Sequence, residues 1–198
     1  KGDQITLWHS PDARSLRCVW TLEEMGVKDY TLITMPFPPR FFHREYLKIN
    51  VLGTIPFLKD GDLTLSDSTA ILRYIREQAG QAFLPNIQSL ETYCLINTLL
   101  DSTINVFLLE RDGLDPQSDT YQNIAYLKRQ NARIKNGLEY LNRLKLNEQT
   151  LDIDVKLRLE CFLAWGLFRQ RFTLEHLPHL QAQLDAAQND EFFILTQP

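Results

Sequence analysis

The chain has 198 residues, of which 44% are hydrophobic and 11% aromatic, so a packed core is expected and extended disorder is not. A net charge of −4 at pH 7 argues against a general nucleic-acid or anionic-membrane binder. No apolar run approaches the roughly 20 residues of a membrane span and no secretory leader is visible, so we expect a cytoplasmic protein.

The chain shows no pattern of metal ligands. Its three cysteines, Cys18, Cys94 and Cys161, are widely spaced and form no Cys-x-x-Cys motif, and its four histidines have no ligand spacing. Each cysteine falls in an apolar-rich helical pattern, so we expect buried free thiols. No metal cofactor is predicted.

The chain opens with a strand, a helix and a second strand. A short β-type run covers residues 5–8, and apolar residues at helical spacing then lead to Gly26, a usual helix stop. A second β-type run covers residues 30–33. This order within about thirty residues predicts a βαβ unit. A short helix over residues 41–49 is expected to follow.

The stretch from residue 53 to residue 71 combines a hairpin with a helix start. Two apolar runs, residues 55–58 and 63–65, flank Asp60-Gly61, where a tight turn needs positive φ. Pro56 has no N–H for a sheet ladder, so the first run is a strand entry or an edge. Asp67 and Ser68 then offer side-chain oxygens at the start of a helix.

From residue 88 onward the pattern is helical throughout. Residues 81–87 are expected to form a linker between a first domain, residues 1–80, and an all-helical domain, residues 88–198. Thr173 is expected to cap the last helix, with Pro178 in its first turn. The three preceding helices are marked by Leu95, Leu99, Val106 and Leu109, by Ile124, Leu127, Ile134, Leu138 and Leu141, and by Val155, Leu159, Phe162, Leu163 and Gly166.

Two motifs resemble the glutathione transferase N-terminal domain. Residues 50–58 read Asn-Val-Leu-Gly-Thr-Ile-Pro-Phe-Leu, similar to the family pattern Asn-Pro-x-Gly-x-(Val/Ile)-Pro-x-Leu. Residues 67–71 read Asp-Ser-Thr-Ala-Ile, similar to (Glu/Asp)-Ser-x-Ala-Ile at a helix start. Val51 replaces the first motif proline, and Thr54 stands where bacterial members often have lysine.

The resemblance implies a fold and a glutathione site. The fold is an α/β thioredoxin-like N-terminal domain, which the element order also supports, followed by an all-α C-terminal domain. Ile55, before a cis Pro56, would pair its backbone with the cysteinyl unit of glutathione, and Asp67 and Ser68 would hold the γ-glutamyl end. The alternative is that Asp67 and Ser68 only cap a helix.

A transferase must stabilise the thiolate of glutathione, because a free thiol has a pKa of ~8.5. The family places the activating residue between the first strand and the first helix. Trp8 occupies the tyrosine-type position and cannot act there. Residues 10–16 read Ser-Pro-Asp-Ala-Arg-Ser-Leu, similar to the bacterial beta-class Ser-Pro-Gly-Ala-Cys-Ser-Leu, whose cysteine falls on Arg14.

A second group of bacterial and fungal members reads Ser-Arg-Ser-x-Arg and then Trp-x-Leu-Glu-Glu-x-Gly. Residues 13–17 and 20–26 resemble it, except that the leading serine is Ala13. We therefore prefer Ser10 as the thiolate donor and keep Ser15, in the first helical turn, as the alternative. Arg14 would add positive charge. The alternative is that these three residues are loop and capping residues that activate no thiol.

The resemblance covers nearly the whole chain and predicts a bacterial-type glutathione transferase. Glutathione would be the co-substrate, a hydrophobic electrophile or a peroxide would be the second substrate, and the protein would be a homodimer. Asp101 would reach across the dimer to the γ-glutamyl amine, or would be a plain solvated aspartate. The competing prediction is a non-catalytic module of the same fold that acts through protein contacts.

Overall fold

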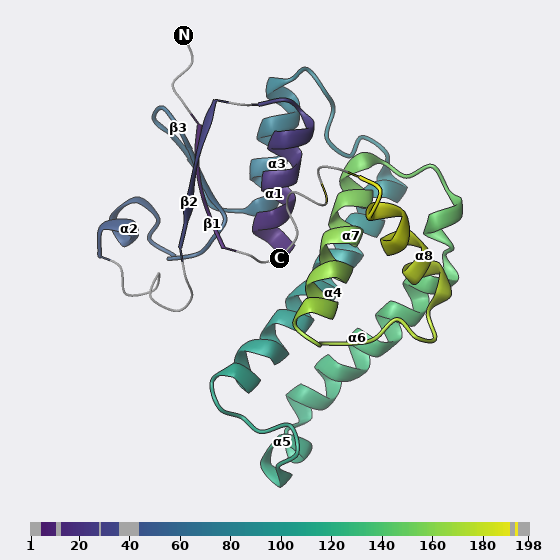
Figure 1. Ribbon diagram of the computed structural model, residues 1–198. Helices are drawn as coiled ribbons and strands as arrows, with labels where there is room; N and C mark the ends of the chain where they lie inside the picture. Colours follow the sequence, from purple (N-terminus) through teal and green to yellow (C-terminus); the bar gives the residue numbers. More distant parts are fainter. Residues whose placement is uncertain (1–4, 11–12, 28, 36–43, 191–192, 194–198) are drawn as a thin grey trace. The chain divides into compact units, whose positions relative to one another are not determined.

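The computed structural model describes residues 5–10, 13–27, 29–35, 44–190 and 193 (Figure 1). The chain divides into two compact units, residues 1–85 with 190–198, and residues 86–189. We call the first the N-terminal unit and the second the helical unit, and describe each by itself.

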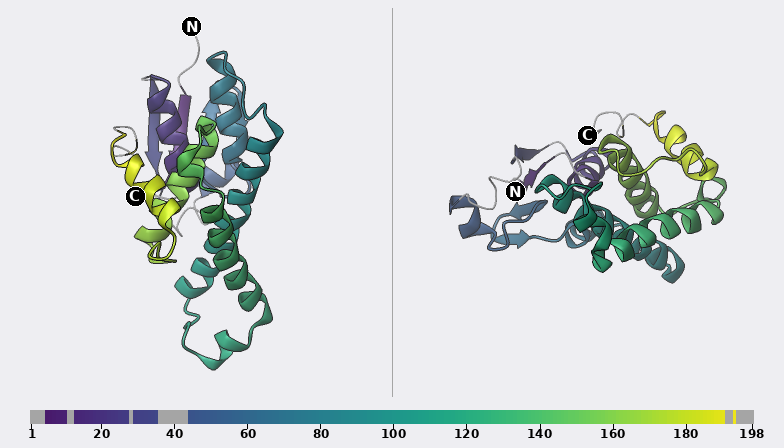
Figure 2. Two further views of the ribbon diagram at one scale, coloured as in Figure 1. Left: turned by 90° about the vertical axis from the view of Figure 1, so that its right-hand side faces the viewer. Right: turned by 90° about the horizontal axis from the view of Figure 1, so that it is seen from below.

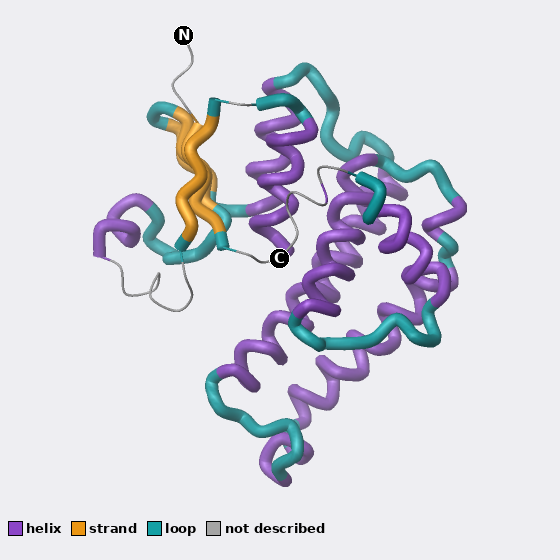
Figure 3. The backbone as a smooth tube through the Cα atoms, viewed as in Figure 1, coloured by secondary structure: helices purple, strands orange, loops and turns teal. Residues whose placement is uncertain are grey.

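A four-stranded sheet forms the centre of the N-terminal unit. Its strands β1 (Ile5–His9), β2 (Tyr30–Thr34), β3 (Phe57–Asp60) and β4 (Leu63–Leu65) lie in the order β2-β1-β3-β4 (Figure 3). β1 and β2 are parallel, joined through helix α1 (Ala13–Glu24), while β3 is antiparallel to both of its neighbours. The predicted βαβ unit is therefore confirmed, and this is the thioredoxin-like layout.

Helices cover the sheet. α1 and α3 (Ser68–Gln78) pack side by side on one face of it (Figures 1 and 2). The short helix α2 (Arg44–Ile49) contributes Tyr46 to an apolar cluster with the side chains of Trp8 and Phe57. The predicted helix over residues 41–49 is thus found from residue 44, and residues 41–43 lie outside the described part.

Local sequence determines where these elements turn. Gly26 ends α1 with a φ of 68°, and Gly61 has a φ of 61° in the β3–β4 hairpin. Both values lie in the left-handed region that glycine adopts at little cost. Asp67 is the N-cap of α3, as predicted.

The helical unit contains α4 (Ile87–Arg111), α5 (Asp119–Asn123), α6 (Ala125–Arg143), α7 (Ile153–Phe168) and α8 (Pro178–Ala187). α4 packs against α6 and α7, and α8 packs against α7. α7 supplies the largest part of the core, since Leu157, Leu159, Phe162 and Leu163 are fully buried.

α4 is long and apolar enough to cross a membrane by length and composition alone, with a mean hydropathy of 1.3 over 18 residues. Seven of its residues are buried, and core helices pass the same test. Length and composition therefore do not assign a span to this helix.

Two sequence predictions are wrong. Cys18 and Cys161 are buried as expected, but Cys94 is exposed, because it lies in an open groove between α4 and α6. Thr173 does not cap the last helix, which begins five residues later at Pro178, with proline in its first turn as expected.

Candidate functional site

The loop that carries Ile55 and Pro56 is held in place by two side chains from the segment that precedes it. Asn50 is buried, and its Nδ2 donates to the Thr54 carbonyl oxygen at 2.7 Å. The Tyr46 hydroxyl donates to the same carbonyl at 2.5 Å. Gly53, between Asn50 and Thr54, turns the chain with a φ of 62°. The backbone that leads into Ile55 is therefore fixed from α2.

The Ile55–Pro56 peptide bond is cis, as the motif predicts. The Ile55 side chain is buried in a cluster with Met35, Tyr46 and Phe57. Within the part of the chain that the structure describes, neither the N–H nor the C=O of Ile55 makes a hydrogen bond. Because folded chains usually pair such groups, the backbone of Ile55 is available to a peptide-like ligand.

Asp67 caps α3 with only one of its carboxylate oxygens. Its Oδ1 accepts from the backbone N–H of Thr69 at 2.8 Å and of Ala70 at 3.3 Å. Oδ2 accepts no hydrogen bond from any described residue, and the side chain is exposed. Capping and ligand binding are therefore compatible, since they use different oxygens.

Ser68, the first residue of α3, is only 7% exposed. Its Oγ accepts a hydrogen bond of 2.7 Å from Nη2 of Arg17, whose side chain on α1 is 0% exposed. In the sequence, Arg17 stands out only as the last residue of the stretch 13–17 that resembles Ser-Arg-Ser-x-Arg, and this resemblance assigns it no role. The signal that could have found it is a charged residue inside the otherwise uncharged run of residues 15–22.

Ser10 and Ser15, the two candidate thiolate donors, lie together. The backbone N–H of Ser10 donates to Oγ of Ser15 at 3.4 Å, a long hydrogen bond. Ser10 is 8% exposed, whereas Ser15 is 0% exposed in the first turn of α1. Arg14, beside Ser15, is half-buried, and residues 11 and 12 lie outside the described part. Ser10 is thus the more exposed of the two serines.

Trp8 and His9 have packing roles. The Trp8 ring centroid lies 5.4 Å from that of Phe57 and 6.2 Å from that of Tyr46, in the apolar cluster. His9 is 9% exposed, with its Nε2 at 3.2 Å from the Thr34 hydroxyl oxygen. Among the described residues, no group of three or more histidine, cysteine or carboxylate side chains is arranged to hold a metal ion.

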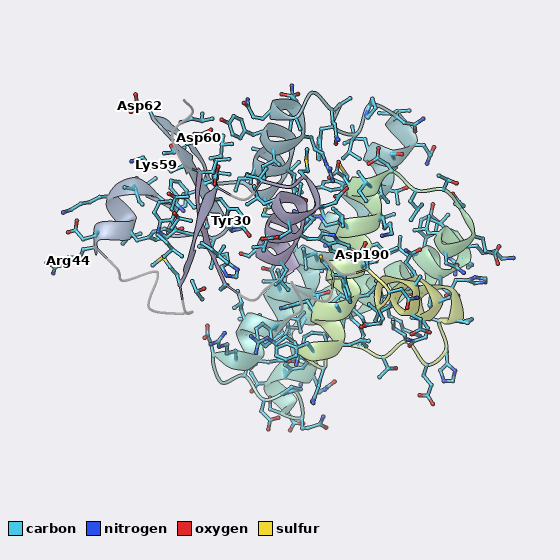
Figure 4. The ribbon with its side chains drawn as sticks, turned by 45° about the horizontal axis from the view of Figure 1, so that its top comes forward. Tyr30, Arg44, Lys59, Asp60, Asp62 and Asp190 are labelled. Atoms are coloured by element: carbon cyan, nitrogen blue, oxygen red, sulfur yellow. The ribbon has the colours of Figure 1, made fainter. Side chains whose placement is uncertain are left out.

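Two tyrosines of this unit stay neutral well above neutral pH. Burial and a hydrogen bond to Glu23 raise the pKa of Tyr30 on β2. A hydrogen bond to Asp60, with some burial, raises the pKa of Tyr74 to about 12. Figure 4 labels Tyr30 and Asp60, which lie on β2 and at the end of β3. Neither phenol can serve as a base at neutral pH.

The helical unit holds the remaining predicted residue and a cavity. Asp101 lies on an exposed part of α4. Its expected contact is with a second chain, so the role of Asp101 stays a prediction. A cavity of about 380 Å³ lies between α4, α6 and the segment after α7, with Val106, Ile134, Arg171 and Phe172 in its wall.

Residues 13–78 match the family model described as "Glutathione S-transferase, N-terminal domain". The chain is 31% identical over 118 residues to "Glutathione S-transferase 3" of Schizosaccharomyces pombe, a stretch covering 56% of this chain and 47% of that protein. It is 45% identical over 60 residues to "Glutathione S-transferase 4" of Zea mays, covering 30% of this chain and 26% of that one. The chain therefore spans less than half the length of these relatives.

Solved structures match over nearly the whole chain. A glutathione transferase family member from Pseudomonas fluorescens, with bound glutathione, has a TM-score of 0.81 at 22% identity, covering 98% of this chain and 99% of that one. A glutathione S-transferase from Methylobacterium radiotolerans, in complex with glutathione sulfonate, has a TM-score of 0.80 at 16% identity, with 98% and 95% covered. The predicted fold, a thioredoxin-like sheet domain followed by an all-helical one, is confirmed.

Proposed function

We propose that this chain, whose residues 13–78 match the glutathione S-transferase N-terminal domain model, binds glutathione on its N-terminal unit. We further propose that it activates the glutathione thiol for attack on a small apolar electrophile or a peroxide. The family match and the glutathione-bound neighbours of the same fold support this proposal. Glutathione would be a co-substrate, with no metal taking part.

The observation that carries the proposal is that the backbone N–H and C=O of Ile55 make no hydrogen bond to any described residue. An extended peptide ligand would satisfy both groups at once. The cysteinyl unit of glutathione is such a ligand. Asp67 and Ser68, in the same domain, would bind the amine and the carboxylate of the γ-glutamyl end.

The thiolate needs a donor that favours the charged sulfur. A hydroxyl that hydrogen-bonds the thiolate more strongly than the thiol lowers the thiol pKa. We assign this role to Ser10, because it is the more exposed of the two serines, and keep Ser15 and the Arg14 guanidinium as alternatives. Parallel changes of each to alanine, with the thiolate absorbance titrated against pH, would identify the donor.

Calorimetric titration with reduced glutathione tests the binding site. Asp67→Ala should weaken binding by ~1–3 kcal/mol, because the ligand's ammonium group loses a charged partner. Asp67→Asn is the matched control, since asparagine caps helices as well as aspartate but carries no charge. The site is supported if Asn and Ala weaken binding alike. If Asn restores the parent affinity, Asp67 acts only as a cap.

The competing function is a non-catalytic module that acts through protein contacts. The chain lacks a tyrosine or cysteine at the usual thiol-activating place, which favours this alternative. Retention on immobilised glutathione, followed by an assay with a generic aromatic electrophile, separates the two. Binding without turnover would favour the module, and turnover abolished by Ser10→Ala would favour the enzyme.

We also propose a homodimer. Val51 and Leu52 in the loop before β3 are 82% and 64% exposed, a large apolar exposure for adjacent side chains. The helical unit has an open groove between α4 and α6, lined by Leu95, Leu99 and Tyr140 among others. A second copy would cover both surfaces if the loop of one chain entered the groove of the other. Asp101 would then face the partner's glutathione.

A further inference from the structure

We propose that Arg17 is the positioning residue of the γ-glutamyl carboxylate subsite, acting on the ligand through Ser68. This inference rests on the proposed glutathione binding and adds a residue to that site. The hydrogen bond from buried Arg17 to Ser68 is the starting observation.

The direction of this hydrogen bond determines what Ser68 can do. A serine hydroxyl has one proton to donate and two lone pairs that accept. Arg17 can only donate, so at 2.7 Å it occupies a lone pair of Ser68 and leaves the hydroxyl proton uncommitted. No described residue accepts that proton. Ser68 is thereby oriented as a donor toward an acceptor that none of the described residues provides.

Charge selects an anion as that acceptor. An arginine guanidinium carries a positive charge, and the Arg17 side chain is 0% exposed, so water does not screen this charge strongly. The N-terminus of α3, which begins at Ser68, adds the positive end of a helix dipole. A carboxylate that accepts a hydrogen bond from Ser68 would be attracted by both the Arg17 charge and the helix dipole. Ser68 is 7% exposed, and a ligand oxygen would approach it through this exposed part of its surface.

The simpler explanation is that Arg17 only ties α1 to α3. The chain supplies a matched control for this explanation in Arg76. This arginine is 1% exposed on α3, and its Nη2 lies 3.1 Å from Oε2 of Glu24 on α1. Arg17 and Arg76 therefore join the same two helices from buried positions, but only Arg17 contacts Ser68.

The experiment compares two ligands on the full chain by calorimetry. One is reduced glutathione. The other is γ-aminobutyryl-cysteinyl-glycine, which keeps the amine and lacks only the γ-glutamyl carboxylate. Arg17→Gln should weaken glutathione binding by about tenfold or more and leave the analogue within about twofold, because the analogue has no group for Ser68 to hold. Ser68→Ala should show the same selectivity, and adding Arg17→Gln to it should cost little more.

Arg76→Gln should lower thermal stability and affect both ligands equally. If Arg17→Gln also weakens both ligands equally, Arg17 is a structural tie and the proposal is overturned. If Arg17→Gln fails to fold, Ser68→Ala and Arg17→Lys test the proposal in its place. Each of these variants must lose affinity for glutathione and keep its affinity for the analogue. A parent that binds neither ligand contradicts the proposed function itself. A parent that binds both equally contradicts only the carboxylate subsite.

Discussion

Gly166 lies where α7 passes beneath the ring of Phe172, so a methyl group added at this position should destabilise the fold. The backbone N–H of Arg171 donates to the Gly166 carbonyl at 2.8 Å, so the chain folds back over the glycine directly after the helix. A Cβ at Gly166 would lie 2.1 Å from Cζ and 2.3 Å from Cε1 of Phe172. Carbon atoms in contact are normally ~3.5–4.0 Å apart, so the ring must move.

The cost follows from two opposing effects of Gly166→Ala. Overpacking a core costs ~1–3 kcal/mol, and an overlap of this depth lies at the upper end of that range. Alanine gains up to ~1 kcal/mol over glycine in a helix. The net expectation is a loss of roughly 2 kcal/mol in the free energy of unfolding. The displaced ring would also leave Phe162, whose ring centroid lies 5.4 Å away.

A double-mutant cycle with Phe172→Ala checks this reasoning. All three of the nearest atoms that a Cβ at Gly166 would meet belong to Phe172. Without that ring, Gly166→Ala should become stabilising by up to ~1 kcal/mol, giving a coupling of roughly 3 kcal/mol. Urea unfolding of the four proteins, followed by circular dichroism, measures it. Equal destabilisation in both backgrounds would refute the steric account.

Two further predictions concern charge and assembly. Asp60→Asn should bring the Tyr74 pKa down from about 12 toward its usual value of 10.0, as ultraviolet titration of the tyrosines would show. Because the folded-state pKa is raised, the stabilisation by this pair is full below pH ~10 and is lost as pH rises through the folded pKa. A Tyr74 titration unchanged by Asp60→Asn would contradict this. Val51→Asp with Leu52→Asp should convert a dimer to monomers in sedimentation velocity, and an unchanged dimer would exclude this loop from the interface.

The elements that local sequence specifies were predictable. Asp60-Gly61 marks the hairpin because a two-residue turn needs positive φ, and Gly61 adopts it. Asp67 marks the start of α3 because its oxygen satisfies N–H groups of the first turn. These signals act within a few residues, so no tertiary information is needed to interpret them.

The parts that depend on packing were not predictable in the same way. Cys94 lies in an apolar-rich stretch, but only the positions of α6 and α7 decide which side of α4 is covered, and Cys94 is exposed. Arg17 and Ser68 are 51 positions apart, so their hydrogen bond exists only once α1 and α3 pack together. Thr173 offers a side-chain oxygen that could cap a helix. The chain directly before it packs the Phe172 ring over Gly166, however, and α8 begins only at Pro178.

The absorbance of the glutathione thiolate, titrated against pH in complex with the parent protein, tests the central claim most directly. The account predicts a bound thiol whose pKa lies below the ~8.5 of a free thiol, so that thiolate is present near neutral pH. It also predicts that Ser10→Ala moves this titration back toward the free value while glutathione still binds. If the complex shows no thiolate below about pH 8, the protein does not activate glutathione, and the transferase proposal must give way to a binding module.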